Sequence, residues 1–308
     1  MSKNYLPDTQ TYFALALDPI HVGTGGYRLG RVDMSIVREP GTNVPKIPGS
    51  SISGACRAYA AMRTAGKYPR CAGQGQEGDK KGHCGQDACP VCTAFGFARG
   101  ERGGRRGLAA FGDARILFFP VHSMAGPVWI TSPQALHDGT GFQPRLADES
   151  RFRLIKGFEN FQPGTQPRRL NLGWLMLEEA GEGDFVLDWQ GGRNHLAAMH
   201  KRVVLVSNKL FGQIVNDNLE VRTSVSIDPE TGAAKEHMLF TYEAIPRGTL
   251  FWFDVVYSDP QFFALTLEPK PAVEKGLRLF EHLGVGGMGT RGMGRLRVLG
   301  LNEREKER

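Results

Sequence analysis

The chain has 308 residues and a formal net charge of +6, from 38 Lys and Arg against 32 Asp and Glu. This length fits one large domain with insertions or two smaller domains, and the modest positive charge suits an anionic partner without requiring one. Residues 1–8 lack the apolar core of a signal peptide, and no apolar run reaches the ~18 residues that span a membrane. We therefore expect a cytoplasmic protein without membrane contact.

The first predicted strand, residues 12–17 (YFALAL), ends at Asp18-Pro19. His21 follows the strand, and a glycine-rich turn at residues 23–30 leads to Asp33. A histidine beside a strand end is more often a structural hydrogen-bonding group than a catalyst. An aspartate after such a turn is either a turn-forming residue or a site for chemistry, and the residues alone leave the two interpretations open.

A helix is predicted from Ser50 to about residue 65, because apolar residues fall at steps of three, four and three: Ile52, Ala55, Tyr59 and Met62. Ser50 or Ser51 is expected to cap its first turn. The free N–H groups and the helix dipole make this end a seat for phosphate, to which Lys46 and Arg57 would add positive charge. The alternative is an ordinary capped amphipathic helix, which composition alone favours.

Residues 67–107 change character, being rich in Gly, Lys and Arg and poor in apolar residues. Four of the five cysteines lie here with the spacing C-x12-C-x4-C-x2-C: Cys71, Cys84, Cys89 and Cys92. The closing pair has the knuckle spacing in which two thiolates bind one tetrahedral ion. We expect a structural zinc ion, because the segment has little to bury; two disulfides are the alternative. His83 is a candidate substitute ligand, and Cys56 is expected to be a small core residue.

Strand character returns at residues 108–121 and 129–130, and Ser132-Pro133 predicts a helix start. Residues 139–192 are loop-rich and place basic side chains among aromatics. Such a mixture suits nucleic acid, although a solvated surface explains it more often. A strand end at 201–206 then leads to a helix at 208–215, which Ser207 is expected to cap.

The pattern that follows predicts a β-hairpin. Residues 221–227 alternate, turn at 228–232 and resume at 237–245. A strongly apolar strand is predicted at 249–257, and Pro271 opens a last helix.

A glycine-rich loop, GVGGMGTRGMG at residues 284–294, joins that helix to a last predicted strand at 295–299. It contains G-x-G-x-x-G strings, but the dinucleotide motif must follow a strand and open a helix. Here the order is helix, glycines, strand, so the Rossmann interpretation is excluded. The glycines instead predict a bare backbone that something such as an RNA strand can approach closely.

This loop, of the form GxGGxGxRGxG, resembles the hallmark of the RAMP superfamily of CRISPR proteins. The succession of Val32-Asp33, residues 37–40 (VREP) and residues 47–51 (IPGSS) is similar to the backbone subunit of type III effectors. Residues 111–133 and the FTYEAIP stretch at 240–246 resemble the Cmr, or type III-B, version of that subunit. The similarity runs in register over most of the chain and is weakest in the cysteine-rich segment.

The resemblance implies an α+β fold: a single RAMP domain over residues 1–308 with a ferredoxin-like (RRM-like) βαββαβ core and insertions. A finger-like zinc-binding insertion would occupy residues 67–107, and a β-hairpin thumb would occupy residues 216–239. Copies of the subunit would stack along a guide RNA, together with other subunits of the Cmr effector complex. Each thumb would interrupt the duplex of guide and complementary target RNA at regular intervals.

The resemblance also implies residue roles. The aspartate that cleaves target RNA falls on Asp33, and His21 and Glu243 are suggested as further catalytic residues. Tyr242 stands where relatives often carry a second acid. Guide phosphates would be held by the helix start and the glycine-rich loop, through Lys46, Ser50, Ser51, Arg57, Gly284, Gly286, Gly287 and Arg291. The Asp33 carboxylate would hold Mg²⁺ or another divalent ion beside the scissile phosphate, or accept the proton of the attacking 2′-OH.

Two other functions remain open. The protein could be a catalytically passive scaffold that coats guide RNA, against which the presence of Asp33 argues. It could also be a guide-processing RAMP endoribonuclease acting through a histidine such as His21. A zinc-binding nucleic-acid protein outside CRISPR systems is a third, more distant interpretation.

Overall fold

The computed structural model of the chain describes residues 5–25, 32–73, 83–100, 103–159, 168–187 and 197–301. A large mixed sheet with the strand order β15-β1-β14-β6-β7-β11-β8 runs through it. These strands are β1 (Asp8–Ala16), β6 (Ala114–Val121), β7 (Val128–Thr131), β8 (Arg153–Leu154), β11 (Val203–Leu205), β14 (Leu250–Tyr257) and β15 (Leu296–Val298). Two short strands extend the sheet: β2 (Lys46–Ile47) pairs with β6, and β5 (Ala109–Phe111) pairs with β14.

The centre of the sheet is antiparallel. Strand β1 pairs with β14 from Asp8 opposite Tyr257 to Leu15 opposite Leu250, and its other edge pairs with β15. Strand β6 is antiparallel to both β14 and β7, whereas β11 is parallel to β7. The apolar stretches predicted as strands at 12–17 and 249–257 are therefore confirmed as the central pair.

Helices α1 (Gly49–Met62) and α6 (Lys270–Arg278) pack together and share the main core with the central strands. Helix α1 buries Ile52, Cys56 and Ala60, one residue per turn, whereas Met62 is 44% exposed. The predicted apolar face is thus rotated by about one residue. Cys56 is fully buried, as expected of a small core residue. The short helix α7 (Phe280–Leu283) follows α6.

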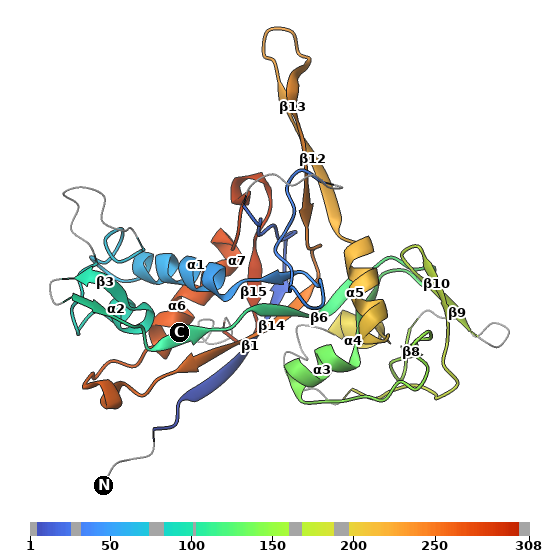
Figure 1. Ribbon diagram of the computed structural model, residues 1–308, viewed down its shortest axis with the longest axis horizontal. Helices are drawn as coiled ribbons and strands as arrows, with labels where there is room; N and C mark the ends of the chain where they lie inside the picture. The colour runs from blue at the N-terminus through green and yellow to red at the C-terminus, as the bar shows by residue number, and fades with distance from the viewer. Residues whose placement is uncertain are drawn as a thin grey trace.

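A second apolar cluster lies beyond β6 and includes Leu136 of α3 (Pro133–Thr140) and Met199 of α4 (Ala197–His200). Helix α5 (Asn208–Asp217) lies near α3 and α4 (Figure 1) but contributes Phe211, Ile214 and Val215 to the main core. The two predicted caps are confirmed: the Ser132 hydroxyl accepts the Ala135 N–H, and the Ser207 hydroxyl accepts the Leu210 N–H. A separate two-stranded sheet is formed by β9 (Arg169–Leu172) and β10 (Leu175–Glu178).

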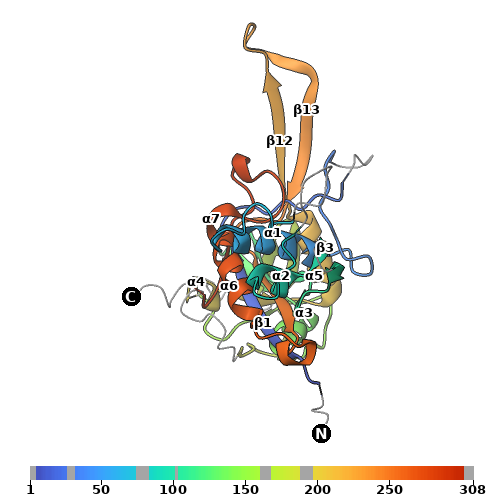
Figure 2. The ribbon, with the colours of Figure 1, turned by 90° about the vertical axis from the view of Figure 1, so that its left-hand side faces the viewer.

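Two features extend from this body (Figures 1 and 2). Beside α1 lies the cysteine-rich segment, with α2 (Pro90–Phe95), β3 (Phe97–Gly100) and β4 (Gly103–Arg105). The predicted hairpin is formed by β12 (Glu220–Ile227) and β13 (Ala234–Ala244) and projects far from the sheet. Its bounds differ from the expected 216–239, because residue 216 belongs to α5 and β13 continues to Ala244.

The described residues also include the 3₁₀ turns η2 (Pro260–Phe263) and, in the glycine-rich loop, η3 (Gly289–Arg291). Within the described residues, no helix combines the length and the apolar character that crossing a membrane requires.

Candidate functional site

Three segments distant in sequence meet at the base of the β12–β13 hairpin. The loop at residues 32–38 runs beside the end of β13: Met34 N–H donates to Thr241 O at 3.0 Å, and Glu243 N–H donates to Met34 O at 3.1 Å. The exit of β1 reaches the same place, where Ile20 bridges Ile245. We call this junction the hairpin-base site.

An apolar cluster holds the junction together. Tyr242, Ala244 and Met293 are buried there, and Met34, Phe240 and Met288 pack against them half-buried. Because Met288 and Met293 belong to the glycine-rich loop, that loop is fixed to the hairpin base as well. Part of the glycine-rich turn predicted at residues 23–30 lies outside the described residues.

Asp33 is exposed at this junction, but its side chain is held on one side. Its Oδ2 atom accepts the Thr241 backbone N–H at 2.7 Å and the Thr241 hydroxyl at 3.0 Å. The Asp33 N–H donates back to Thr241 Oγ1 at 3.2 Å. The Thr241 backbone N–H, followed by the hydroxyl, lowers the pKa of the Asp33 carboxyl, so it is ionised at neutral pH. Oδ1 accepts no hydrogen bond from another described residue.

His21 is only 5% exposed, and its Nδ1 lies 2.6 Å from the backbone oxygen of Glu243. Because a carbonyl oxygen only accepts, Nδ1 carries a proton in this contact. The ring meets Tyr242 edge-on at 5.9 Å between centroids. This environment matches the structural interpretation of a histidine beside a strand end.

The Glu243 carboxylate is engaged by neighbouring residues of the protein. Its Oε2 accepts Arg38 Nη2 at 2.8 Å and the Ile36 N–H at 3.4 Å. Arg38 is itself held by Asn216 Oδ1 at 3.0 Å. This carboxylate, suggested as a further catalytic group, therefore belongs to an ion pair that ties the 36–38 loop to β13. Sequence reasoning missed its partner because Arg38 lies 205 residues away.

Glycines of the glycine-rich loop allow its backbone to pack closely against other backbone segments of the protein. A Cβ added at Gly286, whose φ is +93°, would lie 2.5 Å from His21 O, and one added at Gly284 would lie 2.7 Å from the Gly294 carbonyl carbon. The Gly287 N–H donates to His21 O at 2.8 Å. The expected bare surface is limited to Gly289 and Gly292, where an added Cβ would meet no described atom within 4 Å beyond the neighbouring residues in the chain. Arg291 is exposed between these two glycines.

The start of α1 differs from the predicted phosphate seat. Pro48 occupies the N-cap position without a side-chain cap, and the Gly49 N–H donates to Asp113 Oδ1 at 2.8 Å. Lys46 Nζ lies 2.5 Å from the other oxygen of Asp113. The prediction that Ser50 or Ser51 caps the helix was wrong, because a carboxylate from the β5–β6 link takes that place. Asp113 also forms an ion pair with Lys46, whose charge was expected to add to the phosphate seat.

Arg57 is also not at the start of α1. Its Nε donates to Cys71 O at 2.8 Å and its Nη1 to Phe95 O at 3.4 Å, so the guanidinium lies against the cysteine-rich segment.

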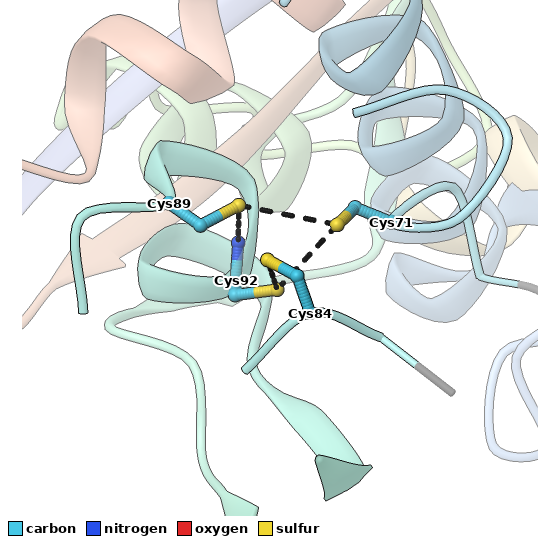
Figure 3. A group of neighbouring side chains, drawn as sticks. All are labelled: Cys71, Cys84, Cys89 and Cys92. Atoms are coloured by element: carbon cyan, nitrogen blue, oxygen red, sulfur yellow. Dashed lines mark hydrogen bonds between the residues drawn. The ribbon is translucent and has the colours of Figure 1, made fainter. Parts of the chain in front are cut away.

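All four predicted ligand cysteines are buried and converge (Figure 3). Their sulfur atoms lie within 4.8 Å of one another, including Cys84–Cys92 at 3.7 Å, Cys71–Cys92 at 3.8 Å and Cys71–Cys89 at 4.0 Å. A tetrahedron of ~2.3 Å zinc–sulfur bonds has edges of about 3.8 Å. All four thiols are free, so the disulfide alternative is contradicted. His83 is not part of the group.

Comparison with known proteins gives a consistent result. The family model described as RAMP superfamily matches residues 14–297. The CRISPR system Cmr endoribonuclease Cmr4 of Pyrococcus furiosus is 27% identical over 255 residues, which are 77% of either chain. A chain of the type III-B Cmr-beta complex bound to cognate target RNA matches with a TM-score of 0.62 and 14% identity, over 96% of this chain and 98% of that chain. Oligomeric Cmr4 from Pyrococcus furiosus matches with a TM-score of 0.57 and 19% identity, over 94% and 98%.

Proposed function

The chain belongs to the RAMP superfamily, and from this premise we propose that it is the repeated backbone subunit of a type III-B CRISPR effector, which binds guide RNA and cleaves complementary target RNA. The relative from Pyrococcus furiosus is named a Cmr endoribonuclease, and the structures of similar fold include an oligomer and a complex with target RNA. The subunit would accordingly work with further copies of itself and with other subunits of the complex.

The observation that carries the catalytic part is the exposed, ionised carboxylate of Asp33 at the hairpin base, with Oδ2 engaged and Oδ1 left for substrate. RNA is cut when its own 2′-OH attacks the adjacent phosphate, leaving a cyclic phosphate and a 5′-OH. An efficient general base has a pKa near the working pH, whereas the pKa of Asp33 is lowered. The carboxylate therefore acts by its negative charge rather than by taking the 2′-OH proton.

A negative charge of this kind suits a divalent cation. Mg²⁺ is commonly bound through one or two protein carboxylates together with substrate phosphates and waters. Asp33 fits this mode of binding, because it does not belong to a cage of several protein ligands. In the described part of the chain, the four cysteines are the one group of three or more close potential metal ligands. A divalent ion there would stabilise charge on the scissile phosphate. The protein's part is to hold Asp33 in place.

The β12–β13 hairpin supplies the geometry of the reaction. It projects from the body directly above the hairpin-base site, where it would enter the guide–target duplex (Figure 1). Forcing a nucleotide out of the stack aligns its 2′-OH with the leaving group, and such alignment accounts for a large part of the barrier. Repeated subunits would place one such hairpin per copy, so cuts would fall at regular intervals.

The order of elements supports a ferredoxin-like core. Along the chain β1, α1, β6, β14, α6 and β15 follow the βαββαβ order, and their sheet order β15-β1-β14-β6 is that of the ferredoxin-like fold. The cysteine-rich segment at residues 67–107 and the β12–β13 hairpin are then insertions into this core. Because Lys46 is paired with Asp113, Arg291 and the open glycines beside it are the first candidates for guide contacts.

The cysteine cluster would hold one structural zinc ion. Four thiolates complete a tetrahedral site and leave no position open for chemistry. The free thiols also suit the reducing cytoplasm, where a CRISPR effector would work.

The test is Asp33→Asn in a reconstituted complex with guide RNA and a labelled complementary target. The amide keeps shape and hydrogen bonding but removes the charge, so cleavage should fall by about 10²–10⁴ while guide loading and target binding stay intact. Chelation of divalent ions should stop the parent in the same way. Asp148→Asn is the control, because the half-buried Asp148 carboxylate also accepts hydrogen bonds, from Ser150, and lies in another part of the chain.

If Asp33→Asn cuts at the parent's rate, the protein is a passive guide-coating scaffold at this site. Guide processing by His21 is disfavoured by the burial of its ring and by its hydrogen bond to the Glu243 carbonyl.

A further inference from the structure

Thr241 is the residue that fixes the orientation of Asp33. We infer that Thr241 is a positioning residue for target-RNA cleavage, which holds the Asp33 carboxylate by Oδ2 and leaves Oδ1 for the substrate side. This inference rests on the proposed function of Asp33. Thr241 itself would touch neither the RNA nor the cation.

The contact is reciprocal, which sets it apart from a chance surface hydrogen bond. The Thr241 backbone N–H and hydroxyl both donate to Asp33 Oδ2, at 2.7 and 3.0 Å, while Thr241 Oγ1 accepts the Asp33 N–H at 3.2 Å. The next residue, Met34, adds a backbone hydrogen bond to Thr241 O at 3.0 Å. Backbone and side chain of Asp33 are thus both tied to one residue of β13.

Such anchoring matters because Asp33 has little else to hold it. The residue is exposed and lies in a bend outside regular secondary structure. An unrestrained surface carboxylate samples several rotamers, and a misplacement of about 1 Å can cost on the order of 10²-fold in rate. Supporting hydrogen bonds of this kind are what keep a reactive group within productive geometry.

Thr241 also links the carboxylate to the hairpin. It lies on β13 opposite Thr223 of β12, within the ladder that continues outward through Val225 and Leu239. Strand β13 is continuous from the hairpin to its base. When the hairpin is seated in the duplex, Asp33 therefore lies at a fixed distance from the point of entry. The position of the cut would therefore follow the position of the hairpin.

The substitution that tests this is Thr241→Val, which keeps volume and the backbone N–H but removes the hydroxyl. Oδ2 then loses one donor and the Asp33 N–H loses its acceptor. Single-turnover cleavage should slow by about 10- to 100-fold, with target affinity unchanged. Because hydrogen bonds to the ionised form hold the pKa of Asp33 down, its pKa should rise toward the ordinary value.

The matched controls are on the same hairpin. Thr241→Ser keeps the hydroxyl and should restore most of the rate. Thr223→Val makes the same chemical change on the facing residue of β12, which is exposed and has no hydrogen bond to Asp33, and should cleave like the parent. The acid limb of the pH–rate profile is compared for all variants, and the pKa of Asp33 is measured by carbon-13 NMR of the full-length protein.

The expected result is a slow Thr241→Val with its acid limb shifted to higher pH, beside Thr241→Ser and Thr223→Val close to the parent. Thr241→Val cleaving at the parent's rate, or with the parent's pKa for Asp33, overturns this inference alone. Equal slowing by Thr223→Val also overturns it, because the effect would then belong to the hairpin. A parent complex that loads guide and target but cuts nothing overturns the proposed function and this inference with it.

Discussion

Arg57 is a largely buried cation whose hydrogen bonds go to backbone carbonyls, and its Nη2 is buried without a hydrogen-bond partner within the described structure. A buried charge is costly unless an opposite charge compensates it. Four thiolates around one divalent cation carry a net charge of −2. Lys67 Nζ also approaches this group, at 3.8 Å from Cys84 Sγ. Arg57 and Lys67 are therefore suited to balance a metal-loaded cysteine cluster.

We expect about one zinc ion per chain in the purified protein by elemental analysis. Arg57→Met keeps the length of the side chain but removes its charge, and should weaken zinc retention by about 10- to 100-fold, as loss of outer-shell partners does. The measurement is zinc release to a chromophoric chelator. Arg63→Met, at an exposed position just after α1, is the control and should release zinc like the parent. Zinc-free protein, or equal release by both variants, would contradict this account.

At the scale of single residues, roles that depend on spacing within one segment could be predicted from the sequence. Contacts between residues far apart in the sequence could not. The cysteine ligands could be predicted because a knuckle pair and its companions are encoded within 22 residues of sequence, 71–92. The true cap of α1, Asp113, lies 64 residues from Gly49, and nothing in the local pattern pointed to it. Thr241 was missed for the same reason, since it meets Asp33 across 208 residues.

At the scale of elements, the contact between α1 and α6 depends on one missing side chain. A Cβ added at Gly276 of α6 would lie 2.2 Å from Cys56 O and 2.7 Å from Cys56 Sγ. Backbone atoms cannot give way there, so the helices would have to separate. The two helices share the core beneath the central strands, and that separation would loosen it.

Gly276→Ala should therefore lower the free energy of unfolding by at least about 1–3 kcal/mol, the usual cost of overpacking a core. Gly54→Ala is the matched change in α1, where Gly54 is exposed with nothing within 4 Å of an added Cβ. It should raise the free energy of unfolding by about 0.5–1 kcal/mol, since Gly disfavours helix interiors. Denaturant unfolding of both variants measures the two changes. Equal stability of the two would mean that the α1–α6 contact is not as close as described.

Helices and strands with capping residues or a clear apolar pattern of their own were predicted from the sequence, whereas their arrangement in space was not. Ser132 and Ser207 predicted the starts of two helices, and the alternation of apolar and polar residues at 221–227 predicted the hairpin. Periodicity carries no information on which strands become neighbours, and the sheet order was expected only through the family resemblance. The hairpin bounds shifted for a physical reason: β13 continues past Leu239 to Ala244 because residues 240–244 pair with residues 220–224 of β12.

At the scale of the whole molecule, the β12–β13 hairpin is the feature that the body does not cover (Figures 1 and 2). Val225, Ile227 and Leu239 on it are 41%, 53% and 64% exposed. A two-stranded hairpin with exposed aliphatic side chains is at most marginally stable alone in water. Its length and exposed surface agree with the proposed function, in which the hairpin enters a guide–target duplex.

The last prediction concerns this hairpin. Residues 225–239 are replaced by Asn-Gly, which joins Ser224 directly to its cross-strand partner Phe240 through a two-residue turn. The base of the ladder and the Thr241–Asp33 contact remain, so guide loading and the catalytic carboxylate should be preserved. The part that would enter the duplex is lost, so no nucleotide is forced out of the stack at a set place. On a long labelled target, the regular ladder of cuts should therefore weaken or blur. Ile227→Thr, which keeps the length of the hairpin, should retain the ladder; unchanged spacing in the shortened variant would show that another element sets the cutting interval.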